Sequence, residues 1–86
     1  MISVIMTAYN AEKYISQAIE SIINQTYEDD WELIIIDDAS TDNTSKECEF
    51  YYETIAPVKY YLRDENGGHT RALNNGLKIA KGDIIA

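Results

Sequence analysis

The chain has 86 residues, enough for one small domain and too few for two. Hydrophobic residues make up 45% of it and charged residues 26%, a globular composition that argues against disorder. The formal net charge of -8 would repel a polyanion, so we expect no nucleic-acid partner. A single cysteine, Cys48, excludes an internal disulfide, and no apolar stretch is long enough to cross a bilayer. We therefore expect a cytoplasmic protein.

The first predicted elements are a strand and a helix. Residues 2–6 (ISVIM) are apolar and β-branched, which predicts a buried strand that ends in a tight turn at residues 7–10. We expect Asn10 to cap a helix that runs from Ala11 to about Gln25. Its apolar residues recur at steps of three and four and predict a face packed on a sheet: Ile15, Ala18, Ile19, Ile22 and Ile23.

A second strand and helix follow. Residues 31–36 read as an unbroken apolar run, which is typical of an interior strand of a parallel sheet. Residues 40–44 (STDNT) are rich in capping side chains and predict the start of a helix that Pro57 ends. The apolar face of this helix is expected to contain Cys48, Tyr51, Tyr52 and Ile55. Cys48 on that face is interpreted as a core residue and not as a nucleophile.

The last third of the chain repeats the pattern. Residues 58–62 (VKYYL) are of mixed polarity and predict a strand at or near a sheet edge, followed by a turn at residues 65–68. A third helix is expected over residues 69–81, closed by Gly82, and a fourth strand over residues 83–86. The apolar stripe of this helix is expected to comprise Ala72, Leu73, Leu77 and Ala80.

This alternation of strands and helices predicts a three-layer, Rossmann-like α/β fold, with a mostly parallel sheet and helices on both faces. We expect residues 1–86 to form a single unit. Ligands of such sheets bind at the carboxyl ends of the strands, where three stretches converge: residues 7–10, 37–40 and 66–71. The last stretch opens a helix with Gly67 and Gly68, and a helix start suits a phosphate. The three stretches together predict a nucleotide site.

Asp37 and Asp38 stand next to each other at the end of the second strand, so their side chains must point in opposite directions. One is expected to brace the backbone and the other to face the cleft, and their spacing does not say which. A dinucleotide-binding domain would need a G-x-G-x-x-G turn after the first strand, where TAYNAE has no glycine. A receiver-like signalling module is a weaker alternative, with Asp64 as its phosphoacceptor, and a non-catalytic nucleotide-binding module is another.

Three segments resemble the start of family 2 glycosyltransferases, nucleotide-sugar-dependent enzymes with the GT-A fold: SVIMTAYNAEKYISQAIESIINQTY, ELIIIDDASTDNT and NGGHTRALNNGLKIAKGDIIA. The resemblance covers essentially the whole chain. It implies that Thr7, Ala8 and Tyr9 line the nucleoside pocket and that Asp38 hydrogen-bonds the base. It further implies that the ribose or diphosphate lies beside residues at the start of the third expected helix: Asn66, Gly67, Gly68, His69 and Arg71.

The resemblance also implies what the parent enzyme does. The donor is expected to be a UDP-sugar, and the acceptor a glycan or a lipid-linked molecule, with the full-length parent associated with a membrane. A divalent cation, Mg²⁺ or Mn²⁺, is expected to bind ligands that lie beyond Ala86, so residues 1–86 contain no expected catalytic or metal-binding residue. We therefore expect the isolated chain to be inactive, and to self-associate through an unpaired edge strand.

Overall fold

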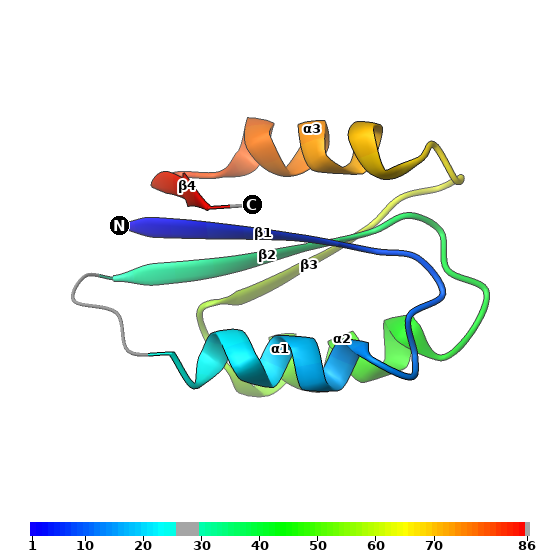
Figure 1. The fold of residues 1–86 in the computed structure, drawn as a ribbon, viewed down its shortest axis with the longest axis horizontal. Coiled ribbons are helices and arrows are strands. Elements are labelled where there is room, and N and C mark those ends of the chain that lie inside the picture. The colour runs from blue at the N-terminus through cyan, green and yellow to red at the C-terminus, as the bar shows by residue number, and fades with distance from the viewer. Residues whose placement is uncertain (26–29, 86) are drawn as a thin grey trace.

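A computed structural model of the chain describes residues 1–25 and 30–85 and has three layers (Figure 1). A four-stranded parallel sheet lies between two helices on one face and one helix on the other. The elements in chain order are β1 (Ile2–Ala8), α1 (Ile15–Ile23), β2 (Trp31–Asp37), α2 (Thr44–Thr54), β3 (Val58–Leu62), α3 (His69–Ile79) and β4 (Asp83–Ile85). The predicted fold class is confirmed. None of the helices in the described ranges has the length and hydropathy needed to cross a bilayer.

The strand order, β3-β2-β1-β4, places the reversal of the sheet between β1 and β4. The connections through α1 and α2 lead outward from β1 to β3 along one face. The connection through α3 then returns across the opposite face to β4 (Figure 1). Because all strands are parallel, the carboxyl ends of β1, β2 and β3 meet at one rim, on the right in Figure 1. This rim is where ligands of doubly wound sheets bind.

The element bounds differ from the expected ones mainly where the chain leaves a strand. β1 continues to Ala8, because Ala8 pairs with Asp37 across the sheet. The prediction that Asn10 caps a helix beginning at Ala11 is wrong: α1 begins at Ile15, and Asn10 adopts a left-handed backbone with φ 49°. α3 begins at His69 as expected but ends at Ile79.

Most of the apolar core lies between the sheet and the pair α1 and α2. β2 contributes Leu33 and Ile35 to it, α1 contributes Ile19, and α2 contributes Cys48, all completely buried. Burial, followed by the nearby negative charges of Asp37 and Glu47, raises the pKa of the Cys48 thiol to about 12. The interpretation of Cys48 as a core residue is therefore confirmed.

The opposite face of the sheet carries a smaller core under α3. Ile34 and Ile36 pack there against Ala72, and the helix lies close to the sheet because Gly76 faces β1. A Cβ atom at Gly76 would fall 2.5 Å from the Cγ2 atom of Ile5. Leu77, which was expected in the apolar stripe, is 40% exposed, and Gly76 takes its place against the sheet.

Residues 31–36 are not an unbroken apolar run, as was expected, because they include Glu32, which is only 2% exposed. Its carboxylate accepts hydrogen bonds from Ser3 Oγ at 2.6 Å, from Lys59 Nζ at 2.7 Å and from the Lys81 N–H at 2.9 Å. Glu32 thus joins β1, β2, β3 and the entry to β4 near the amino ends of the strands. This network lies at the end of the sheet away from the rim.

Candidate functional site

A small pocket of about 160 Å³ opens at the rim between the ends of β1 and β2 and the start of α3. Its lining residues are Thr7, Ala8, Tyr9, Asp38, His69 and Ala72. All of these except Ala72 were predicted site residues, and they come from three separate stretches of the chain. Ligand pockets usually enclose about 300–1,000 Å³, so this pocket would hold a single ring of a larger ligand.

Thr7 and His69 face each other across this pocket. The hydroxyl oxygen of Thr7 lies 2.7 Å from Nδ1 of His69, although 62 positions separate the two residues. When Nδ1 accepts the Thr7 proton, the imidazole carries its own proton on Nε2 and can donate it to a ligand. This contact ties the end of β1 to the first residue of α3.

The carboxylate of Asp38 is held by the loop that leads into α3. Its Oδ1 atom accepts a hydrogen bond from the Gly67 N–H at 3.0 Å, and its Oδ2 atom accepts one from the Gly68 N–H at 2.8 Å. The Nε atom of Arg63 lies 2.9 Å from Oδ1. The Gly67 N–H, more than any other group, lowers the pKa of Asp38, and the Gly68 N–H and the Arg63 charge lower it further. Gly68 has a φ of 90°, a conformation that favours glycine.

The neighbouring acid, Asp37, has a different environment. It is completely buried, accepting the Ser40 N–H on Oδ1 at 2.9 Å and the Tyr60 hydroxyl on Oδ2 at 2.6 Å. Burial and this hydrogen bond to a carboxylate raise the pKa of Tyr60. Asp37 is thus the acid that only braces structure. One acid was expected to brace the backbone and the other to face the cleft. Asp37 only braces the backbone, but Asp38 does both, because it holds the Gly67–Gly68 loop and also lines the pocket.

The two loops at the rim are bound to each other. The Asn10 N–H donates to Ser40 Oγ at 2.9 Å, and the Asn10 side chain accepts the Thr41 N–H at 2.7 Å. The Glu12 N–H donates to Asp42, at 3.2 Å from Oδ2. Asn10 therefore holds the loop after β1 against the loop after β2, instead of capping α1. These bonds add to the pairing of β1 with β2, in which the Asp38 N–H donates to the Ala8 carbonyl at 2.8 Å.

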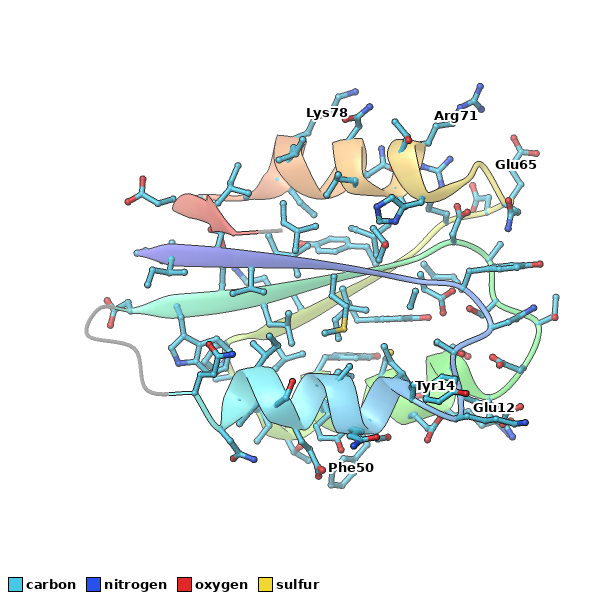
Figure 2. The ribbon with its side chains drawn as sticks, in the orientation of Figure 1. Glu12, Tyr14, Phe50, Glu65, Arg71 and Lys78 are labelled. Carbon is cyan, nitrogen blue, oxygen red and sulfur yellow. The ribbon has the colours of Figure 1, made fainter. Side chains whose placement is uncertain are left out.

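The remaining predicted residues lie around the pocket without lining it. Gly67 and Gly68 contact Asp38, while Asn66 is exposed. Arg71 is also exposed and points away from the sheet on the outer side of α3 (Figure 2). A phosphate bound by Arg71 would have to lie over the outside of the first turn of α3.

Residues 1–25 and 30–85 contain no group of three His, Cys, Asp or Glu side chains placed to hold a metal ion. The two candidate carboxylates are already engaged: Asp37 by Ser40 and Tyr60, and Asp38 by two glycine N–H groups and Arg63. A divalent cation needs several free oxygen ligands. These residues therefore do not fit a metal site.

A larger cleft of about 700 Å³ lies between β3 and α3 and shares no lining residue with the small pocket. It is lined by Ile36, Tyr61, Leu62, Arg63, Asp64, Glu65, Asn75, Lys78 and Ile79. Its charges are mixed, and none of the predicted site residues lines it, so its size alone does not make it the site. Asp64, the acid that a receiver-like module would use, is exposed and lines this cleft, whereas Asp38 lines the small pocket.

Sequence reasoning missed Arg63 and Tyr60, which hold the two acids. Both come from β3 or the residue after it, and they contact Asp38 and Asp37 respectively. Its position could have identified Arg63 as a site residue, because Arg63 directly follows a strand whose carboxyl end lies on the rim. Tyr60 carried no such signal, because its partner depends on the pairing of β2 with β3.

Comparison with protein families matches residues 3–86 to the model described as glycosyl transferase family 2. Among curated relatives, the chain is 41% identical over 87 aligned positions to WfgD of Escherichia coli, described as a UDP-Glc:alpha-D-GlcNAc-diphosphoundecaprenol beta-1,3-glucosyltransferase. That alignment covers 100% of this chain and 33% of WfgD.

Two solved structures have the same fold. TarS 1-349 of S. aureus, in complex with UDP-GlcNAc, superposes with a TM-score of 0.88 at 33% identity, covering 98% of this chain and 25% of that one. The mannosyltransferase PcManGT of Pyrobaculum calidifontis, in complex with GDP-Man and Mn²⁺, gives 0.85 at 30% identity, covering 93% and 24%. The chain therefore spans only a minor part of the length of the proteins it resembles.

Proposed function

We propose that this chain, which belongs to glycosyl transferase family 2, binds the nucleotide of a nucleotide-sugar donor at the pocket between Thr7, Asp38 and His69. The observation that carries the proposal is the state of Asp38. Asp38 is only 3% exposed at the rim, and its pKa is lowered. A carboxylate has about four lone-pair positions; the Gly67 and Gly68 N–H groups occupy one on each oxygen, and the Arg63 guanidinium lies against Oδ1 at 2.9 Å and shields it from the pocket. One acceptor position remains for a ligand.

A uracil ring suits this pocket. Its ring N–H would donate to the open position on Asp38, and such a bond to a charged acceptor is stronger than one between neutral groups. Tyr9 is 50% exposed at the mouth of the pocket, and its ring can pack against a base. That the related TarS binds UDP-GlcNAc supports a UDP-sugar as the donor.

The ribose and diphosphate would extend from the base toward residues 66–71. The first turn of α3 presents backbone N–H groups that no helical partner uses, and the helix dipole favours a negative charge there. His69 begins this helix and would donate to a phosphate or ribose oxygen. Asn66, Gly67 and Gly68 form the approach to it.

We further propose that the parent enzyme transfers the donor sugar to a glycan or a lipid-linked acceptor. The name of WfgD, which includes a diphosphoundecaprenol-linked acceptor, supports the second possibility. A divalent cation, when bound, would neutralise charge on the diphosphate, as the Mn²⁺ in the PcManGT complex suggests. Its ligands are expected beyond Ala86, and so are the acceptor-binding residues. The isolated chain is thus expected to bind a nucleotide without transferring sugar, and the cytoplasmic location stays a prediction.

Titration of the 86-residue chain with UDP, followed by calorimetry and amide chemical shifts, tests the nucleotide site. We expect shifts at Thr7, Tyr9 and Asp38, and we expect Asp38→Asn to weaken binding by about tenfold, because one charge-assisted hydrogen bond is worth roughly 1.5–3 kcal/mol. Asp64→Asn is the matched control, since Asp64 is an exposed acid in the larger cleft.

The control variant should bind UDP like the wild-type chain. Shifts confined to the larger cleft, or equal losses for both variants, would refute this site.

A further inference from the structure

Arg63 lies between the pocket and α3 and contacts residues on both sides. Its Nε atom lies 2.9 Å from Asp38 Oδ1, and its Nη1 atom donates to Asn75 Oδ1 in α3. The Arg63 side chain is 20% exposed, so most of it is withdrawn from water. Arg63 therefore joins the end of β3, the acid after β2 and the middle of α3.

Two further contacts fix the place of this side chain. The Arg63 N–H donates to the Asp37 carbonyl at 2.8 Å, which anchors its backbone at the rim. The guanidinium also packs beneath Gly67, where a Cβ atom would fall 2.5 Å from Nη2. The absence of a Cβ atom at Gly67 thus lets the loop lie over the guanidinium in its present position while the Gly67 N–H reaches Asp38. The arrangement leaves Arg63 little freedom to move.

The two oxygens of Asp38 are consequently unequal. Oδ1 accepts the Gly67 N–H and also lies 2.9 Å from Arg63 Nε, an ion pair in which Nε–H makes no hydrogen bond, whereas Oδ2 accepts only the Gly68 N–H. Without the guanidinium, only the two glycine N–H groups would hold the carboxylate, and its last torsion has broad minima that would let it turn further from its present position. A rotated carboxylate would no longer present one defined acceptor to the pocket.

We propose that Arg63 is a positioning residue for the nucleotide site: it holds the Asp38 carboxylate so that one acceptor position, on Oδ2, faces the bound base. This inference rests on the proposed role of Asp38. Arg63 acts through Asp38 and does not itself line the small pocket. Its removal should therefore weaken nucleotide binding only while Asp38 is present as a carboxylate.

A double-mutant cycle between Arg63→Gln and Asp38→Asn tests this dependence, with UDP as the ligand. We expect Arg63→Gln to weaken UDP binding by about five- to tenfold, in the range of one hydrogen bond to a charged group. In the Asp38→Asn background the same change should cost less than about twofold, because the group it positions is gone. Arg63→Lys keeps the charge without the planar fork and should recover part of the loss.

Lys78→Gln is the matched control, because Lys78 is an exposed cation that lines the larger cleft. It should leave UDP binding unchanged. The amide resonances of Gly67 and Gly68 provide a ligand-free readout: they should shift in Arg63→Gln and stay in place in Lys78→Gln, since they report the bonds to Asp38.

Equal losses for Arg63→Gln in both backgrounds would overturn the inference, as would glycine amides that do not move. Should Arg63→Gln fail to fold, Arg63→Lys decides through the same cycle and the same amides. A wild-type chain that binds no UDP would overturn the proposed function and with it the role at a nucleotide site. The glycine amides would still show, separately, whether Arg63 holds Asp38.

Discussion

Two residues of the rim loops, Asn10 and Ala39, have left-handed backbones, with φ of 49° and 62°. Asparagine tolerates this conformation, and Asn10 also uses its side chain to hold Thr41. For a residue with a Cβ atom, this backbone region is unfavourable by about 1–2 kcal/mol. Ala39 has no polar side chain with which to offset that cost. It directly follows Asp38, so the strain lies beside the candidate site, where strained backbone is commonly found.

Ala39→Gly is expected to stabilise the chain by about 0.5–1 kcal/mol, because relief of the left-handed strain exceeds the added entropy of the unfolded glycine. Urea unfolding measures the change. Ala56→Gly is the control: Ala56 is exposed and has no positive φ, so the same substitution there should destabilise by a similar amount. Destabilisation by both variants would mean that the methyl group of Ala39 contributes more than its backbone costs.

His69 and Arg71 were expected to bind a diphosphate together, and the structure separates them. His69 lines the pocket and contacts Thr7, whereas Arg71 points away from the sheet (Figure 2). We expect His69→Ala to weaken UDP binding more than uridine binding, because the lost donor serves the phosphate end. Arg71→Ala should have the smaller effect on UDP. Calorimetry with both ligands measures this, and equal losses for uridine and UDP would contradict the placement of His69.

Among the elements, different hydrogen-bond networks connect the strands at the two ends of the sheet. The rim end has the hydrogen-bonded loops after β1 and β2, and the other end has Glu32, which receives donors from β1, β3 and the entry to β4. Burial of Glu32 by itself would raise the pKa, but bonds from Lys59, Ser3 and Lys81 outweigh it. The pKa of Glu32 falls to about 2, from an ordinary value of 4.5.

This lowered pKa predicts the acid stability of the sheet. A carboxyl whose pKa is lower in the folded chain contributes stability above its unfolded pKa, and that contribution disappears as the pH falls through the folded pKa. For Glu32 the loss should extend from about pH 4.5 to about pH 2. Its size is up to about 3 kcal/mol, at 1.36 kcal/mol for each pKa unit.

Glu32→Gln should therefore be less stable than the wild-type chain at neutral pH, and should lose less stability between pH 5 and pH 2. Urea unfolding at a series of pH values gives the comparison. Glu53→Gln, an exposed acid of α2, is the control and should leave the acid dependence as it is in the wild-type chain. Parallel pH profiles for Glu32→Gln and the wild-type chain would rule out this role for Glu32.

For the molecule as a whole, the open edges of the sheet are the features that invite contact with another chain. Within the described residues, β3 pairs only with β2 and β4 only with β1. β3 carries Lys59, and lysine on an edge strand discourages strand pairing. β4 is apolar after Asp83, and Ile84 is 46% exposed. Self-association through β4 stays a prediction of the sequence.

Sedimentation velocity of the 86-residue chain at increasing concentration tests this prediction. We expect a concentration-dependent dimer or larger species that Ile84→Lys reduces, because a charge on an edge strand opposes pairing. Leu77→Lys is matched in exposure, at 40%, but lies on α3, and should leave the association intact. A chain that stays monomeric, or equal effects of the two lysine variants, would contradict association through β4.

The sequence by itself determined the order of elements and the fold class. Apolar period and turn residues are local properties, so they sufficed to predict β3 at residues 58–62 and the start of α3 at His69. The convergence of Thr7, Asp38 and His69 also followed, because parallel strands with right-handed crossovers place their carboxyl ends at one rim. Local pattern could not show that Asn10 binds Thr41 or that Glu32 is buried in an apolar strand.

Only the tertiary structure decided what each acid of the pair contacts. Asp37 and Asp38 are alike in sequence, and their partners, Tyr60 for one and Gly67, Gly68 and Arg63 for the other, lie more than twenty positions away. Such contacts depend on the register of β2 against β3 and on how closely α3 packs at Gly76. The register of the strands and the distance between helix and sheet depend on packing throughout the core. Side chains distant in sequence fill that core together, so no local stretch determines either quantity.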